Sequence, residues 1–452
     1  NHGSLSDRIM SRYGDTPEGM VESCMEFLRI CVAENFTDVV ISIKASNTVV
    51  MVKTVRLLVD VMEKEGMAFP LHLGVTEAGD GEDGRIKSAL GIGALLSDGL
   101  GDTIRVSLSE APEAEIPVAR KLVDYVLLRQ EHPYIPGLEA PEFNYLSPER
   151  RKTKAVRNIG GEHVPVVIAD RMDGKTEVNP QFTPDYIYAG RALPEQREEG
   201  VEYILDADVW QGEAGTWPAF NHAQLPLMGE CDAALKFLFI PYMAQTDEVI
   251  ACLKYHPEVV IISQSNHPNR LGEHRALVHQ LMTEGLQNPV VFFQHYAEDD
   301  AENLQIKSAA DMGALIFDGL CDGIFLFNQG SLSHAVIDAT AFGILQAGRT
   351  RTSKTEYISC PGCGRTLYDL EKTIARIKAA TSHLKGLKIG IMGCIVNGPG
   401  EMADADYGYV GAGRGKISLY KGKVCVEKNI PEEEAVERLL EFIRTDREEN
   451  QQ

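Results

Sequence analysis

Short apolar runs alternate with longer amphipathic stretches along the first hundred residues. The apolar runs at residues 38–43, 71–75 and 104–108 have the length of buried strands. Residues 49–65 and 87–97, which lie between them, carry apolar side chains at helical spacing. This succession predicts βα units in a parallel sheet, with functional side chains at the carboxyl ends of the strands.

A second series of apolar runs follows at residues 164–169, 186–189, 201–205 and 235–240. The stretch 130–154, which precedes this series, is rich in proline, glycine and charge, and predicts a linker. Together with later strands, the second series supplies about enough βα units for a barrel of the TIM type. We therefore expect two barrel-like regions in one α/β chain.

An internal repeat connects the two series. The string IKSALGIGALLSDGLGD at residues 86–102 recurs as IKSAADMGALIFDGLCD at residues 306–322, an offset too long for a solenoid and typical of a duplicated domain. The copies differ at their strand ends, where the predicted pairs are Lys44 with Ser263 or Gln264, Glu77 with Ala297, Arg105 with Phe325, and Ser107 with Phe327. Since the second copy lacks the charges of the first, we expect it to be mainly structural.

The last hundred residues have a different pattern. Helical spacing at residues 367–380 and 432–444, an apolar run at 387–392 and a hairpin-like stretch at 416–426 predict an α+β module. The expected fold is thus α/β, with part of a TIM-type barrel, an inserted second TIM-like barrel and a C-terminal α+β domain. The expected domains are 1–130, the C-terminal half of the first barrel without its early strands; 131–345, the inserted barrel; and 346–452.

Composition narrows the class of protein. The chain has 452 residues, of which 44% are hydrophobic and 24% charged, and no apolar run long enough to span a bilayer. Its net charge of −22 disfavours non-specific binding to nucleic acid. The nine cysteines are too scattered for a secreted disulfide scaffold, which indicates a reducing compartment. The chain begins N-H-G-S-L without an initiator methionine, so we expect an N-terminally truncated chain.

Three cysteines near the C-terminus have the spacing of metal ligands. Cys360 and Cys363 lie in S-C-P-G-C-G-R-T, and Cys394 lies in I-M-G-C-I-V-N-G-P-G-E. Three thiolates with one open position suit a catalytic iron–sulfur cluster, because a fully capped cluster cannot easily take a substrate atom onto iron. A structural zinc site, with His383 as fourth ligand, is the alternative. For a cluster, Glu401 is a candidate for a weak, exchangeable fourth ligand, and Cys425 competes with it.

Polar residues at the ends of the first strands suggest an anion site. Lys44, Arg105 and Ser107 combine a point charge, a fork of donors and a hydroxyl, which together form a plausible phosphate cradle. Glu77 would lie beside them and is a candidate proton donor. The alternatives are charged loop ends in solvent and a salt bridge between Glu77 and Lys44.

Long ordered motifs resemble one enzyme family. The strings N-H-G-S-L, S-I-K-A-S, L-H-L-G-V-T-E-A-G, G-D-T-I-R-V-S-L, Y-I-S-C-P-G-C-G-R-T and I-M-G-C-I-V-N-G-P-G-E-M-A-D-A-D are similar to those of 4-hydroxy-3-methylbut-2-enyl diphosphate synthases. The likeness covers roughly residues 1–130 and 340–445. The segment between them resembles the extra domain of the three-domain form of that family.

This resemblance implies a [4Fe–4S] cluster held by Cys360, Cys363, Cys394 and Glu401. It implies reductive ring opening of 2-C-methyl-D-erythritol 2,4-cyclodiphosphate in isoprenoid biosynthesis by the methylerythritol phosphate route. The residues it assigns to the diphosphate are Asn1, Lys44, Arg105 and Ser107, with Glu77 as the acid and Asn397 near the substrate. It also implies flavodoxin or ferredoxin as electron donor, and a location in the bacterial cytoplasm, or in the plastid stroma if the source is a plant.

Two other classes of protein compete with this interpretation. One is an electron-transfer or zinc-stabilised interaction protein in which the barrels are scaffolds. The other is a barrel methyltransferase related to pterin-binding enzymes, which would not need the N-G-P-G-E loop.

Overall fold

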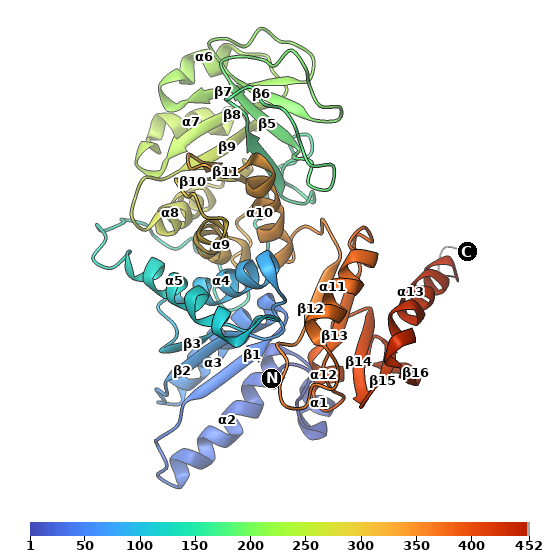
Figure 1. The fold of residues 1–452 in the computed structure, drawn as a ribbon. Coiled ribbons are helices and arrows are strands. Elements are labelled where there is room, and N and C mark those ends of the chain that lie inside the picture. The colour runs from blue at the N-terminus through green and yellow to red at the C-terminus, as the bar shows by residue number, and fades with distance from the viewer. Residues whose placement is uncertain (450–452) are drawn as a thin grey trace. The chain divides into compact units, whose positions relative to one another are not determined.

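The computed structural model describes residues 1–449 and divides into two compact units (Figure 1). Unit 1 consists of Asn1–Val123 together with the C-terminal segment that begins at Thr352, and unit 2 consists of Asp124–Arg351. Among the described residues, no helix has both the length and the apolar character that a bilayer span requires.

The first part of unit 1 contains a three-stranded parallel sheet in the order β1-β2-β3. β2 lies at the predicted residues, whereas β1 begins later than expected and β3 ends earlier. α4 begins well before the predicted residue 87, because Glu82 and Asp83 in its first turn stabilise the helix N-terminus. The elements are α1 (Asp7–Tyr13), α2 (Pro17–Ala33), β1 (Ile41–Ala45), α3 (Thr48–Lys64), β2 (Leu71–Val75), α4 (Gly81–Ser97), β3 (Thr103–Arg105), η1 (Pro112–Ala114) and α5 (Glu115–Leu127).

The C-terminal part of unit 1 is an α+β domain, as predicted. Its sheet has the order β12-β13-β14-β15-β16, parallel over the first three strands and antiparallel over the last three. The prediction missed β14, because the glycines in Y-G-Y-V-G-A-G hide its strand pattern. The elements are β12 (Glu356–Ser359), α11 (Leu370–Thr381), β13 (Lys388–Met392), α12 (Gly398–Glu401), β14 (Tyr407–Gly413), β15 (Lys416–Lys421), β16 (Val424–Pro431) and α13 (Glu432–Glu449).

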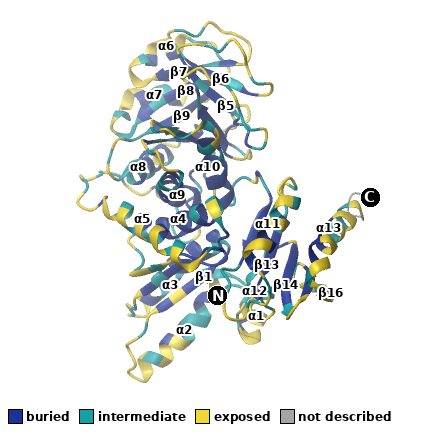
Figure 2. Ribbon diagram, viewed as in Figure 1, coloured by how far each residue is buried: buried dark blue, intermediate teal, exposed yellow. Residues whose placement is uncertain are grey.

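Unit 2 is a closed eight-stranded barrel with all neighbouring strands parallel, which confirms the predicted TIM-like fold. Its strands appear largely buried in Figure 2. The prediction missed β7, because Pro218 argues against a central strand. The strands are β4 (Val166–Asp170), β5 (Tyr186–Gly190), β6 (Glu202–Asp206), β7 (Thr216–Asn221), β8 (Lys236–Pro241), β9 (Val259–Gln264), β10 (Val290–Tyr296) and β11 (Gly323–Asn328).

Helices follow the later strands of the barrel. The α-helices that follow β7, β8, β9, β10 and β11 cover the outside of the barrel in the usual βα manner. The elements are η2 (His222–Gln224), α6 (Leu225–Glu230), η3 (Tyr242–Ala244), α7 (Asp247–Tyr255), α8 (Arg270–Thr283), α9 (Ala301–Phe317) and α10 (His334–Ala347).

Matching ion pairs support the predicted duplication. In unit 1, Arg56 on α3 bonds to Asp98 at the end of α4, at 2.8 Å from Nη2 to Oδ2. In unit 2, Arg275 on α8 bonds to Asp318 at the end of α9, also at 2.8 Å. Because the same two positions of the repeat carry the same pair in both units, the copies share their helix packing as well as their sequence.

A matching hydrogen bond fixes the alignment of the strands. The backbone N–H of Leu71 donates to Asp102 in unit 1 at 2.8 Å, and that of Val290 donates to Asp322 in unit 2 at 3.0 Å. Leu71 and Val290 are therefore equivalent. The pairing of neighbouring strands in each unit then aligns the remaining positions. Lys44 is equivalent to Gln264, Arg105 to Phe325, and Glu77 to Tyr296. The pairing of Glu77 with Ala297 was wrong by one residue, because a one-residue gap between the copies lies between β10 and α9.

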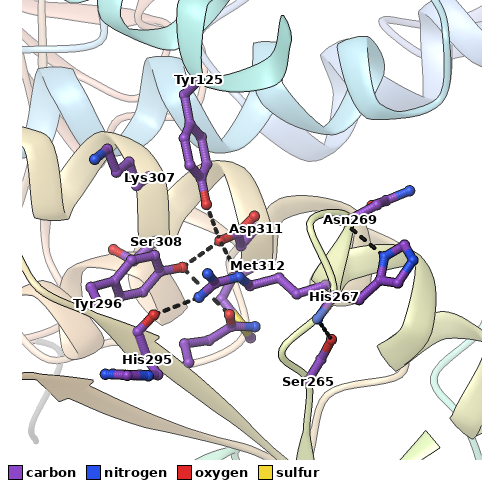
Figure 3. A network of polar contacts seen from close by, with 12 residues as sticks. Tyr125, Ser265, His267, Asn269, His295, Tyr296, Lys307, Ser308, Asp311 and Met312 are labelled. Atoms are coloured by element: carbon purple, nitrogen blue, oxygen red, sulfur yellow. Dashed lines mark hydrogen bonds and ion pairs between the residues drawn. The ribbon is translucent and has the colours of Figure 1, made fainter. Parts of the chain in front are cut away.

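A buried carboxylate anchors the start of unit 2 to its barrel (Figure 3). Asp311 on α9 accepts hydrogen bonds from the hydroxyls of Tyr125, at 2.6 Å, and Tyr296, at 2.5 Å. It also pairs with Arg129 and lies 3.7 Å from the guanidinium of Arg270. The end of α5 is thereby fixed to β10 and α9.

Candidate active site

One cavity of unit 1, with a volume of about 420 Å³, gathers the predicted site residues. It lies where the carboxyl ends of β1, β2 and β3 meet the cysteine loops of the C-terminal domain. All predicted site residues except Ser107 line it: Asn1, Lys44, Glu77, Arg105, Cys360, Cys363, Cys394, Asn397 and Glu401. Ser42 and Thr76, which the sequence did not single out, line it as well, and so does Arg365.

Lys44 and Arg105 face the cavity from the two strands that flank β2. Both pair with Gly74 in the parallel register. A Cβ at Gly74 would lie 3.2 Å from Cε of Lys44, so the glycine leaves room for the lysine side chain to cross β2. Burial, together with the neighbouring Arg105 charge, lowers the pKa of the Lys44 ammonium. Two cations held this close disfavour each other and favour a bound anion.

Glu77 is buried at the cavity wall in an unusual backbone conformation. Its φ of 50° is in the left-handed region, which a residue with a side chain adopts only at a cost of about 1–2 kcal/mol. Its Oε2 has no hydrogen-bond partner among the described residues. Burial, and next the negative charge of Glu401, raise the pKa of Glu77 to about 8. Glu77 is thus held in its protonated form near neutral pH, as a proton donor requires.

The cysteine sulfurs are held by backbone N–H groups. Gly393 donates to Sγ of Cys360 at 3.2 Å, and Arg365 donates to Sγ of Cys363 at 3.4 Å. The Arg365 hydrogen bond lowers the pKa of the Cys363 thiol, whereas burial raises that of Cys360. Donors aimed at the sulfurs stabilise thiolates and tune iron–sulfur sites.

The candidates for a fourth ligand are separated by the fold. Glu401, at the end of α12, lines the same cavity as the three cysteines. His383 lines a different groove, beside α13, and Cys425 lies on β16 with its thiol toward the carbonyl of Glu427. Among the described residues, no three histidine, cysteine or acidic side chains are grouped closely enough to hold a single metal ion.

Ser107 is set apart from the other predicted residues. β3 ends at Arg105, and Ser107 follows it in a buried position, 2% exposed. It is not among the residues that line the cavity.

Serine hydroxyls join the barrel fragment to the cysteine domain, which the sequence did not indicate. Ser109 Oγ lies 2.8 Å from Ser359 Oγ and also donates to the carbonyl of Cys360 at 3.2 Å. Ser46 Oγ donates to the carbonyl of Glu401 at 3.3 Å. These bonds fix the backbone of two predicted ligands. Single serines carry no signal of such long-range contacts, since Ser109 and Ser359 lie 250 residues apart.

Two glycines allow the N-terminal loop to reach the cysteine domain. A Cβ on Gly400 would lie 2.5 Å from the carbonyl oxygen of Gly3, and a Cβ on Gly3 would lie 2.0 Å from that of Gly400. Only glycine permits this approach. The contact brings Asn1 to the cavity beside the loop that carries Asn397 and Glu401.

Lysines secure the same junction at the start of α4. Lys87 pairs with Glu356 at 3.0 Å, and both are buried. Lys354 pairs with Asp83 at 2.7 Å, and Lys378 pairs with Asp80. Because these pairs span the two halves of unit 1, they hold the two halves together beside the cavity.

Comparison with known proteins identifies the two halves of unit 1. The GcpE TIM-barrel domain matches residues 1–120, and the GcpE protein C-terminal domain matches residues 356–445. A curated 4-hydroxy-3-methylbut-2-en-1-yl diphosphate synthase (flavodoxin) of Bacteroides thetaiotaomicron is 95% identical over 449 residues, which are 99% of this chain and 73% of that protein.

More distant relatives carry the same name. The synthase of Porphyromonas gingivalis is 48% identical over 445 residues, 98% of this chain and 71% of its own length. That of Chlorobaculum tepidum is 42% identical over an alignment of 519 residues, gaps included, which covers 98% of this chain and 68% of that protein. The chain therefore belongs to the GcpE family of 4-hydroxy-3-methylbut-2-en-1-yl diphosphate synthases (flavodoxin).

Proposed function

We propose that this chain carries out the reductive ring opening and dehydroxylation of 2-C-methyl-D-erythritol 2,4-cyclodiphosphate to 4-hydroxy-3-methylbut-2-enyl diphosphate. The reaction takes up two electrons and two protons and releases one water. The observation that carries the proposal is the shared cavity, in which Lys44 and Arg105 lie with three cysteines and Glu401. The relatives are curated as synthases of the same product, which supports this reaction.

Cys360, Cys363, Cys394 and Glu401 would hold a [4Fe–4S] cluster. The residues fit such a group, because N–H donors already face two of the sulfurs and all four side chains line one cavity. They fit a single zinc ion less well, because no close grouping of three ligands is formed among residues 1–449 and His383 lies elsewhere. When bound, the cluster supplies electrons to the substrate and an iron site with a displaceable ligand.

The remaining residues bind the substrate and provide a proton. Lys44 and Arg105 would hold the diphosphate by charge-assisted hydrogen bonds, with Asn1 closing the cradle. Glu77 would protonate the departing oxygen, since its carboxyl is buried and its Oε2 has no partner within the described part of the chain. Asn397 would orient the substrate from the cysteine side. Ser107, which is buried two residues after Arg105, would affect diphosphate binding only indirectly, by helping to position Arg105.

We propose flavodoxin as the electron donor, because the relatives' name includes it, and the cytoplasm of a bacterium as the location, because those relatives are bacterial. Three basic residues of the sequence, Arg365, Lys372 and Lys378, are candidates for a patch that docks an acidic carrier. This patch is weakened, because Lys372 pairs with Asp369 and Lys378 pairs with Asp80. Arg365 keeps its place at the cavity and is the cation best placed to receive an acidic carrier.

We also propose a division of labour among the three predicted segments. Residues 1–130 would bind substrate, 346–452 would carry the cluster, and 131–345 would serve as a scaffold. One chain would supply both halves of the active site, since both belong to unit 1. Mixing the strongly impaired Lys44→Ala protein with the Cys360→Ala protein tests this. We expect no recovered activity, whereas recovery in mixed oligomers would show that the halves come from different chains.

Turnover of the cyclic diphosphate with reduced flavodoxin tests the reaction itself. In the whole protein, we expect product formation, and Glu401→Ala should abolish turnover while retaining iron in an altered environment. Unchanged turnover in Glu401→Ala would remove Glu401 from the mechanism. Failure of a protein with its full iron and sulfide content to consume the substrate would refute the proposed function.

A further inference from the structure

The mouth of the closed barrel in unit 2 contains a second cavity, with a volume of about 450 Å³. Strands β5 to β11 each contribute a residue, and Met172 follows β4. A cavity of this size, built from the carboxyl ends of barrel strands, is where barrels of this type bind small molecules.

Five aromatic rings, carried by β5, β8, β10 and β11, line this cavity. Tyr188 lies 5.7 Å from both Phe239 and Phe325 between ring centroids, and Phe293 lies 4.9 Å from Phe325 and 5.9 Å from Phe327. Phe325 is buried, whereas the other four rings are only half-buried. Exposed aromatic rings lose hydrophobic stabilisation, which a ligand in the mouth would restore.

A carboxylate lies beside the rings, on the strand next to the one that carries Tyr188. Asp206, at the end of β6, accepts a hydrogen bond from the hydroxyl of Tyr188 at 2.6 Å. It has no cationic partner among residues 1–449. The adjacent Asp208, in contrast, is exposed and pairs with Arg191 at 2.7 Å. Arg191 and Asp208 line the same cavity as Asp206, so its three charged side chains leave one net negative charge beside the aromatic rings.

Two equivalent strand-end positions carry cations in the cavity of unit 1. Gln264 and Phe325 occupy the positions of Lys44 and Arg105. Both pairs line the cavities of their own units. The duplication has therefore kept a concave mouth while replacing the cations that attract an anion.

We propose that the mouth of the second barrel binds a small organic cation, such as an alkylated ammonium, between its aromatic rings and Asp206. Aromatic faces attract cations within about 6 Å of the ring centre, and they do so most strongly when water is excluded. Asp206 adds a charge of the complementary sign. This site is separate from the proposed reaction, so its test does not depend on turnover.

Choline and its uncharged isostere 3,3-dimethylbutan-1-ol are the probes that test the site. They have nearly the same shape and differ in charge. Saturation-transfer NMR and equilibrium dialysis on the whole protein give the affinity of each. We expect choline to bind about tenfold more tightly than the alcohol, as cation–π and carboxylate contacts predict. Equal affinities, or binding of neither probe, would overturn the proposal.

Two variants locate the binding. Asp206→Asn keeps an acceptor for Tyr188 and removes the charge, so the tenfold preference for choline should disappear. Asp173→Asn is the matched control, because it removes an exposed carboxylate that pairs with Lys175 and does not line this cavity, and the preference should persist. Phe239→Leu should weaken both probes, and more so choline. An unchanged preference in Asp206→Asn, with the thermal midpoint retained, would contradict the site.

Discussion

The two barrel-derived regions share a framework and differ at its functional end. The same arginine–aspartate pair joins their helices, and the same aspartate receives the N–H at the start of the middle strand. At the strand ends, however, Lys44 and Arg105 of the first copy are replaced by Gln264 and Phe325. The packing interactions of the framework have thus persisted, whereas the residues that would contact a ligand have changed. This is expected when function lies in sites placed on a fold.

A further difference concerns how each copy fills the space between helix and strand. In the first copy, Gly91 on α4 would place a Cβ within 2.9 Å of Val75, so no larger residue fits. In the second copy, the equivalent residue is Asp311, which lies at the centre of the polar network of Figure 3. An apolar contact has become a buried ionic anchor for residues that precede the barrel.

Removing this anchor should produce the largest effect on stability. Asp311→Ala leaves Arg129 without this carboxylate, removes the acceptor of the Tyr125 hydroxyl, and leaves the Tyr296 hydroxyl only the longer bond to Gln294 at 3.4 Å. We expect a loss of about 3–5 kcal/mol in the free energy of unfolding, which urea denaturation of the whole protein would measure. The exposed Asp208→Ala, whose partner is Arg191, should cost about 0–1 kcal/mol. Equal losses would show that the network is not an anchor.

Substitution at the equivalent strand ends should separate the two mouths functionally. Lys44→Ala removes a charge-assisted hydrogen bond to the proposed diphosphate, so we expect kcat/KM to fall about 100-fold. Gln264→Ala, at the same position of the second copy, should leave kcat/KM unchanged. Steady-state kinetics on the two variants provides the measurement. A comparable loss in Gln264→Ala would mean that the second barrel takes part in the reaction.

The second copy should also be the more sensitive to acid. His274 is fully buried, its Nδ1 lies 2.7 Å from Ser263 Oγ, and burial lowers its pKa to about 3. Below its ordinary pKa of about 6.5, this histidine takes up a proton in the unfolded chain but stays neutral in the folded protein. The free energy of unfolding is therefore highest above pH 6.5 and decreases as the pH falls toward 3. We expect about 2 kcal/mol less stability at pH 5 than at pH 7 from this residue.

The variant His274→Val isolates this contribution. Valine is the residue at the equivalent position 55 of the first copy, and it does not titrate. Thermal midpoints from pH 7 to pH 5 should fall less steeply in the variant than in the parent protein, whatever the absolute midpoints are. Parallel slopes would show that His274 does not limit acid stability.

The sequence predicted those parts of the fold that depend on local patterns. β2 was found at the predicted residues, and the repeat led to β9, β10 and β11. β7 and β14 were missed because Pro218 and the glycines of β14 contradict strand propensity, and tertiary pairing overrides that propensity.

The site shows the same division. Lys44, Glu77 and the three cysteines could be predicted, because strand ends and cysteine spacing carry a chemical signal. The positive φ of Glu77 and the bond of Ser109 to Ser359 could not, because each depends on chain segments that only the folded structure brings together.

The central claim is that three cysteines and Glu401 share one cavity with an anion cradle as parts of an iron–sulfur redox site. Iron and sulfide analysis with electron paramagnetic resonance on the anaerobically reconstituted protein tests it most directly. We predict about four irons and four sulfides per chain, as a [4Fe–4S] cluster requires, and a spectrum that changes when the cyclic diphosphate is added. Zinc at about one per chain, without sulfide, would contradict the account and favour a structural metal site.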